Sequence, residues 1–120
     1  MHNVCHWELQ TINPETAKKF YGTLFGWKLQ YEKEMNYVLV DTGTPPGGGM
    51  NVVKQVMPGP AVLVILVEDV EKSLNKAASL GGKIITPKHD IPGVGYYGAF
   101  QDTEGNQIGI FTPLPGSMPN

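Results

Sequence analysis

A histidine and a glutamate stand two residues apart near the start of the chain. The stretch VCHWELQ, residues 4–10, alternates in the manner of a β-strand, so His6 and Glu8 would share one face of that strand. Imidazole and carboxylate groups are common metal ligands, and both can act as general bases. The spacing therefore predicts half of a metal site or a proton-transferring pair, whose remaining groups must come from elsewhere in the fold.

The composition indicates one globular domain. The 120 residues are 41% hydrophobic and 17% charged, and the formal net charge of −2 comes without a clustered basic surface. No apolar run approaches the roughly 20 residues of a membrane helix, and the N-terminus does not resemble a signal peptide. Cys5 is the single cysteine and is expected in the core rather than as a nucleophile. We therefore expect a cytoplasmic protein that binds neither nucleic acid nor membrane.

Two helices are expected, each with its own cap. Asn13 and Asp69 are suitable N-caps, and Gly26 and Gly81–Gly82 are suitable helix ends. Apolar side chains at helical spacing form one stripe on each helix, namely Ala17, Phe20, Tyr21 and Leu24 on the first, and Val70, Leu74 and Ala77 on the second. Both helices are therefore expected to pack against a sheet.

The rest of the chain is expected to form eight strands separated by short turns. DTEGN, residues 102–106, is a compact turn, and residues 45–49 are expected to be a loop. The expected strands cover residues 4–11, 27–32, 37–42, 50–56, 62–67, 83–87, 96–101 and 107–112.

The order strand, helix, three strands therefore occurs twice. His6 and Val62 are 56 residues apart, as are Asn13 and Asp69. This pattern predicts an α+β fold of two tandem βαβββ modules, about 4–57 and 61–113, within a single domain of residues 1–115. Each module would lay its helix outside, so that the two inner faces form a cupped half-barrel with a central cavity. Residues 116–120 are expected to be a frayed tail.

Two blocks of sequence carry a family resemblance. HWELQTINPETAKKFYGTLFGW near the start and YYGAFQDTEGNQIGIFTP near the end, set on the twofold pattern, resemble the vicinal oxygen chelate superfamily. That superfamily includes glyoxalase I, bleomycin-resistance proteins and extradiol dioxygenases. The resemblance is strongest to small bacterial proteins described as related to lactoylglutathione lyase. It implies the cupped fold, a small-molecule ligand and a homodimer.

The resemblance also implies where a metal would bind. Metal-binding members hold one divalent ion through ligands from the first, fourth, fifth and eighth strands, typically two His and two Glu. His6 matches the first of these positions, whereas the fifth strand offers Val62 and the eighth Gly109. The fourth-strand position falls at Gly49 or Met50. Valine and glycine have no side-chain donor, and a thioether is a poor ligand for such ions, so we expect no metal cofactor.

Two roles remain open for each polar residue of the first strand. His6 is either a ligand or general base, or a cavity histidine satisfied by hydrogen bonds. Glu8 is either a base with a pKa raised by an apolar cup, or one partner of a salt bridge at the rim. Both are therefore catalytic candidates as well as ligand-binding ones.

The remaining candidate site residues are expected on the inner strand faces. Val62 and Val64 would supply aliphatic surface, and Gly109 would leave space. Phe111 is two residues after Gly109 and would therefore lie on the same face of the strand. His89 is expected in a loop near the mouth. The full set of expected ligand-binding residues is His6, Glu8, Tyr37, Met50, Val62, Val64, Gln101, Gly109 and Phe111.

The leading functional hypothesis is binding of a small, largely apolar organic ligand in the central cup, without the usual divalent metal and with catalysis left open. One alternative is a glyoxalase-related, metal-dependent lyase or isomerase, in which Glu8 or His6 would take a carbon-bound proton. Another is a resistance protein that sequesters a drug.

Overall fold

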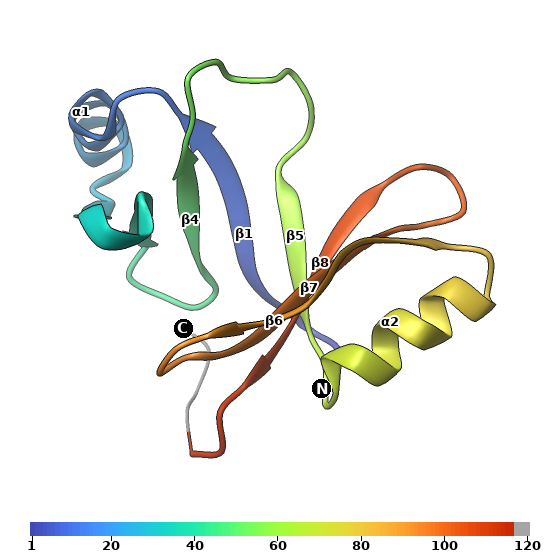
Figure 1. Cartoon of the computed structure of the whole chain (residues 1–120). Coiled ribbons are helices and arrows are strands. Elements are labelled where there is room, and N and C mark those ends of the chain that lie inside the picture. Colours follow the sequence, from blue (N-terminus) through green and yellow to red (C-terminus); the bar gives the residue numbers. More distant parts are fainter. Residues whose placement is uncertain (117–120) are drawn as a thin grey trace. The chain divides into compact units, whose positions relative to one another are not determined.

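The computed structural model describes residues 1–116 and contains the expected order of elements (Figure 1). Strand, helix and three strands occur twice, which confirms the α+β class and the two βαβββ modules. The elements are β1 (Val4–Thr11), α1 (Pro14–Phe25), β2 (Lys28–Glu32), the short 3-10 helix η1 (Lys33–Met35), β3 (Tyr37–Asp41), β4 (Gly47–Val52), β5 (Val62–Leu66), α2 (Val70–Ser79), β6 (Lys83–Ile91), β7 (Gly95–Gln101) and β8 (Gln107–Pro113).

The chain divides into two compact units. The first unit is His6–Ala61, and the second unit joins Met1–Cys5 to the chain from Val62 onward. The N-terminal segment is tied to β5, because the Leu66 carbonyl accepts from His2 N–H over 3.0 Å and Leu66 N–H donates to the Asn3 carbonyl over 2.9 Å. The frayed tail expected at 116–120 falls almost wholly outside the described residues.

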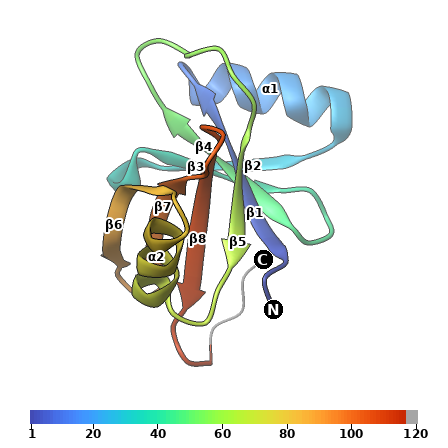
Figure 2. The ribbon, with the colours of Figure 1, turned by 90° about the vertical axis from the view of Figure 1, so that its right-hand side faces the viewer.

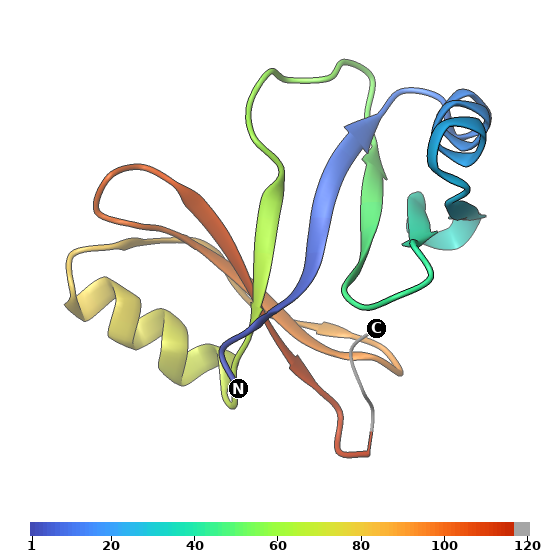
Figure 3. The same cartoon turned by 180° about the vertical axis from the view of Figure 1, so that it is seen from behind.

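The first unit contains a four-stranded sheet in the order β2-β3-β4-β1. β1 runs parallel to β4, side by side with it in Figure 3, and the other neighbours are antiparallel. The helix α1 supplies Ala17 to a core that also contains Leu29, Val38, Val40 and Met50. Trp7 packs against this core, so strand alternation places His6, Glu8 and Tyr37 on the opposite face.

The helix α1 begins and ends as expected, but fewer of its apolar side chains are buried than expected. Asn13 Oδ1 accepts from the backbone N–H groups at positions 15 and 16, and Gly26 closes the helix in the left-handed conformation at φ 74°. Ala17 is buried, whereas Phe20 and Leu24 are each 58% exposed, so the expected four-residue stripe is wrong at these two positions. The buried stripe of α1 is therefore narrower than expected, and within it Tyr21 packs against the core and stacks on Trp27, with ring centroids 5.4 Å apart.

The second unit contains a sheet in the order β5-β8-β7-β6, with α2 lying against it (Figure 2). β5 runs parallel to β8, and the other neighbours are antiparallel. The α2 side chains Val70 and Leu74 are buried with Val67 and Ile110. Asp69 caps α2 as expected by accepting from Lys72 N–H over 3.0 Å. No helix among the described residues is long and apolar enough to cross a membrane.

The strand β4 begins earlier than the sequence predicts. It covers Gly47–Val52, so the loop expected at 45–49 is wrong from Gly47 onward, and the strand expected at 50–56 is right only as far as Val52. A Cβ atom at Gly48 would overlap the Trp7 ring, and one at Gly49 would overlap the Tyr37 ring. The glycine run is therefore strand backbone over which two aromatic rings lie, although glycine on average disfavours strands.

The strand β6 continues past the proline at which it was expected to end. It covers Lys83–Ile91 and pairs His89 with Tyr97, so the expected loop position of His89 is wrong. The pairing register shifts between Thr86 and His89, the interval that contains Pro87. The irregularity accommodates a residue that cannot donate to the ladder, and the strand then resumes.

Candidate functional site

A hydrogen-bonded chain joins three polar side chains in the first unit. The Tyr37 Oη atom lies 2.7 Å from His6 Nε2, and the Tyr37 hydroxyl donates to Glu8 Oε2 over 2.9 Å. All three side chains are half-buried and lie on the sheet face away from α1. We call His6, Tyr37 and Glu8 the polar cluster. The structure thus brings together three of the residues that the sequence singled out.

A glycine makes this arrangement possible. Tyr37 lies on β3, whereas His6 and Glu8 lie on β1, and β4 runs between these two strands. On β4, Gly49 is beside Glu8 on one side and beside Leu39 on the other. Because a Cβ at Gly49 would overlap the Tyr37 ring, only a position without a side chain lets the phenol cross β4 and reach β1.

The direction of the hydrogen bonds assigns the His6 tautomer. The single Tyr37 hydroxyl proton is donated to Glu8, so the Tyr37 oxygen accepts from His6 Nε2–H, and Nδ1 carries the imidazole lone pair. Burial lowers the pKa of His6, and the nearby Glu8 carboxylate opposes this only in part. At neutral pH the cluster therefore combines a neutral imidazole, a phenol and one carboxylate.

The lowered pKa of His6 has a consequence for stability. The unfolded chain binds a proton at His6 more readily than the folded chain, so stability is intact above the unfolded value of about 6.5 and falls as pH drops from there toward the folded pKa. We expect the loss of melting temperature between about pH 7.5 and about pH 5.5 to be smaller in a His6→Gln variant than in the parent.

Glutamine is the appropriate replacement because its amide can still donate to Tyr37. His2→Gln is the matched control, since His2 is exposed and should leave the pH dependence unchanged. Tyr37, which contacts His6 directly, and Glu8, whose charge acts on His6, are retained in both variants. Equal pH dependence in His6→Gln and the parent would contradict the lowered pKa.

Met50 lies elsewhere than the sequence suggested. It is 1% exposed and belongs to the core beneath α1 with Val38 and Val40, so it does not share the face of the polar cluster. The fourth-strand position is Gly49, because the Tyr37 ring lies over Gly49 just as the Tyr97 ring lies over Gly109. These two arrangements are equivalent in the two modules.

The second unit holds the remaining expected residues on a largely apolar face. Val64 lies beside Gly109, and Phe111 lies beside Tyr97, on the sheet face away from α2. Gln101 pairs with Gln107 at the end of the same ladder, and Val62 begins β5. This face is therefore polar chiefly at its edges, in contrast to the face of the first unit that carries the polar cluster.

Sequence reasoning missed Tyr97 and the joining role of Tyr37. Strand alternation lets only one of the adjacent residues Tyr96 and Tyr97 face inward, and the structure places Tyr96 on the α2 side. A usable signal existed, because Tyr37 precedes Gly49 by the same interval as Tyr97 precedes Gly109. Comparison of the two modules at these strands would have found both tyrosines.

The side chains present do not fit the four-ligand metal site that the family resemblance describes. Gly49, Val62 and Gly109 provide no donor atom, and His6 Nε2 is already engaged by Tyr37. Within residues 1–116 no three His, Cys, Asp or Glu side chains are grouped so that they could hold a metal ion. Cys5 is buried, and burial raises the pKa of its thiol, as expected for a core residue.

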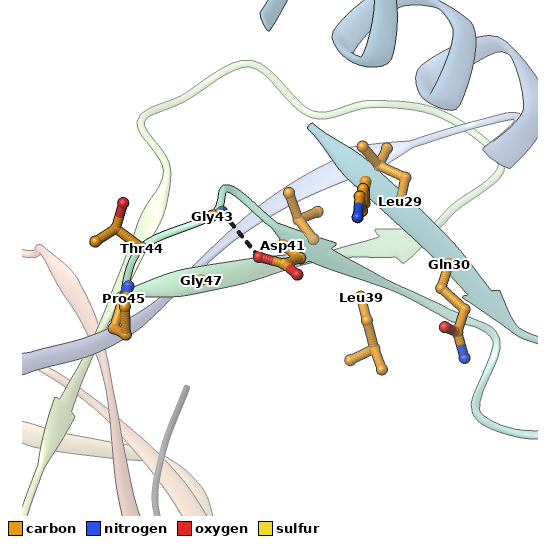
Figure 4. A pocket seen from close by; sticks show the side chains of 10 residues that line it. Leu29, Gln30, Leu39, Asp41, Gly43, Thr44, Pro45 and Gly47 are labelled. Atoms are coloured by element: carbon orange, nitrogen blue, oxygen red, sulfur yellow. Dashed lines mark hydrogen bonds between the residues drawn. The ribbon is translucent and has the colours of Figure 1, made fainter. Parts of the chain in front are cut away.

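An open hollow of about 430 Å³ lies in the first unit (Figure 4). Leu39, Asp41 and Gln30 line it from β2 and β3, and Gly47 of β4, which is paired in register with His6, lines it as well. Asp41 is held in place by accepting from Gly43 N–H over 2.8 Å. The hollow is large enough for a small ligand, although none of the three cluster side chains lines it.

The chain matches known proteins along most of its length. The sequence pattern of the Glyoxalase/Bleomycin resistance protein/Dioxygenase superfamily matches residues 3–110. The protein named "Putative glyoxylase CFP32" of Mycobacterium tuberculosis is 29% identical in an alignment of 112 residues that covers 90% of this chain and 43% of that protein. A glyoxylase-like domain-containing protein of Didymella fabae is 30% identical over 114 residues, covering 88% of this chain and 89% of that protein.

A solved structure extends the comparison to the fold. The crystal structure of methylmalonyl-CoA epimerase from Mycobacterium tuberculosis aligns with a TM-score of 0.69 at 12% identity, covering 93% of this chain and 88% of the other. At that identity the similarity shows the fold alone. The present chain spans less than half the length of the mycobacterial glyoxylase relative that it matches.

Proposed function

Because the chain belongs to the Glyoxalase/Bleomycin resistance protein/Dioxygenase superfamily, whose members bind small molecules, we propose that it binds a small, largely apolar organic ligand and holds the ligand's polar group at the polar cluster. The chain of hydrogen bonds from His6 through Tyr37 to Glu8 is the observation that supports this proposal. Such convergent polar side chains beside apolar surface are typical of small-molecule sites.

We further propose that binding needs no divalent metal. His6 Nε2 carries the proton that it donates to Tyr37, so only Nδ1 has a lone pair to offer an ion. Together with Glu8 this makes two ligands, fewer than the three or four protein ligands of zinc-type sites. The phenol over Gly49 fills the space in which a fourth-strand ligand would stand. Tyr37 thus takes over the positioning of His6 that a metal would otherwise provide.

A thermal-shift experiment tests both parts of the proposal. Aromatic and aldehyde metabolites should include compounds that raise the melting temperature of the parent through ligand linkage, and the rise should be lost in Tyr37→Phe. Nickel, zinc and manganese ions should produce no rise that depends on His6. The measurement is the melting temperature with and without each compound or ion.

Tyr31→Phe is the matched control, because Tyr31 is an exposed tyrosine of the same unit whose hydroxyl donates to Asn36 instead. The Tyr31→Phe variant should show the same ligand-induced increases in melting temperature as the parent. Hits that stabilise Tyr37→Phe as well as the parent would count against binding at the polar cluster. Stoichiometric metal in protein purified without chelator, absent from His6→Ala, would overturn the metal-free proposal.

A second candidate is a glyoxalase-related lyase or isomerase, favoured by the glyoxylase names of the relatives. Glu8, or His6 through Nδ1, would take the carbon-bound proton. Turnover of a glutathione–methylglyoxal hemithioacetal would support this candidate, whereas an apolar ligand that co-purifies unchanged would support a sequestering protein.

We also propose that the protein is cytoplasmic and forms a homodimer, the commonest closed assembly.

A further inference from the structure

The hydrogen-bond chain uses up every donor of the polar cluster. His6 donates through Nε2–H to Tyr37, Tyr37 donates through its hydroxyl to Glu8, and a carboxylate has no donor of its own. The polar atoms that remain are His6 Nδ1 and Glu8 Oε1, and both are acceptors. The side chains of the polar cluster therefore offer a ligand hydrogen-bond acceptors but no free hydrogen-bond donor.

Both remaining acceptors are accessible. Neither His6 Nδ1 nor Glu8 Oε1 takes part in a hydrogen bond among the described residues. In the same part of the chain, no buried side-chain nitrogen or oxygen lacks a partner. The two acceptors therefore reach the surface of the molecule, where a bound group can contact them.

The charged side chains on the same sheet face also favour a ligand group that is a cation or a hydrogen-bond donor. Strand alternation places Glu32 and Asp41 on the face that carries Glu8, and Lys28 lies directly beside Asp41 in register. Three carboxylates thus share this face with one ammonium group, while the lowered pKa of His6 keeps the imidazole neutral. The resulting negative potential attracts cations and repels anions.

We propose that the polar cluster recognises ligands through a hydrogen-bond donor, preferring a primary ammonium group, accepting a hydroxyl group and excluding a carboxylate. An ammonium group carries three N–H donors, enough to serve His6 Nδ1 and Glu8 Oε1, and its bond to Glu8 is charge-assisted. A carboxylate would place its charge beside that of Glu8 with no donor to receive it. This inference names the ligand class for the proposed function and rests on it.

Three probes with one common ring test this selectivity: benzylammonium, benzyl alcohol and benzoate. Their dissociation constants can be measured at about pH 7.5 by NMR titration of the His6 imidazole signals. Benzylammonium should bind at least about tenfold more tightly than benzoate, with benzyl alcohol between them. Glu8→Gln should reduce the tenfold preference to about threefold or less, whereas Glu32→Gln, which removes an equal charge from the same face, should retain it.

The outcomes separate this inference from the proposed function. Benzoate binding as tightly as benzylammonium would overturn the donor selectivity and leave ligand binding at the cluster intact. No change in the His6 signals with any probe would overturn both. If Glu8→Gln does not fold, the imidazole ¹⁵N shifts of the parent decide the matter, because they report which nitrogen is protonated. A proton on Nδ1 rather than Nε2 would contradict the assigned hydrogen-bond direction.

Discussion

A Gly48→Val variant is expected to lose about 3 kcal/mol of unfolding free energy, at the upper end of the usual range for overpacked cores. A Cβ at Gly48 would overlap three atoms of the Trp7 indole ring. That ring is confined, because Trp7 packs against the buried core of the first unit and lies 5.5 Å from the ring of Trp27. Valine is otherwise favoured in strands, so the loss would come from the collision with Trp7.

A double-mutant cycle isolates that collision. In a Trp7→Ala background, which is itself destabilised, Gly48→Val should cost less than about 1 kcal/mol, because the space above position 48 is then free. Asn51→Val is the matched control, since it places valine at an exposed position of the same strand and should change stability by about 0.5 kcal/mol or less. The measurement is chemical denaturation of all variants. An equal cost of Gly48→Val with and without Trp7 would rule out this explanation.

The same two rings explain why the sequence placed β4 wrongly. Local propensity assigns the run Gly47–Gly49 to a loop, because glycine has a low strand propensity and no side chain that could pack in a sheet. What makes these residues a strand is the pair of aromatic side chains from β1 and β3, which need bare backbone beneath them. Trp7 lies about 40 residues from Gly48, and Tyr37 lies 12 residues from Gly49 on a different strand, so the requirement depends on strand pairing, which local propensity does not describe.

Features set by neighbouring residues were predicted well. Asn13 and Asp69 cap their helices, because each supplies an oxygen to backbone N–H groups two or three residues ahead. Strand alternation likewise placed His6 and Glu8 on one face and Trp7 on the other, and it assigned Val64 to the inner face on which Gly109 was expected. The twofold module pattern then follows from repeating such local rules.

The candidate site was predicted only in part, because it too depends on how the strands pair. Alternation assigns a residue to a face, but it does not say how far along that face a side chain reaches. Tyr37 was expected only as one ligand-binding residue among nine, yet its hydroxyl joins His6 to Glu8 across an intervening strand. The reach depends on Gly49, whose role becomes visible only when the register of β3, β4 and β1 is known.

Met50 shows the opposite error, in which one residue of uncertain register was assigned to the wrong face. A Met50→Ala variant is expected to lose about 2–5 kcal/mol of unfolding free energy, because the truncated side chain leaves a cavity in a fully buried position. Met50 is surrounded by Leu29, Val38 and Val40 in the core beneath α1, and strands fixed on both sides of β4 limit the collapse of that cavity.

Met35→Ala is the matched control, because Met35 is 56% exposed in η1 of the same unit and its truncation removes the same atoms from water-accessible surface. It should change stability by about 0.5 kcal/mol or less in the same denaturation experiment. Below its unfolding transition, Met50→Ala should also keep the probe affinities of the parent, since Met50 lies on the face opposite the polar cluster. A stable Met50→Ala protein with weakened binding of benzylammonium would instead place Met50 in the ligand site, as the sequence first suggested.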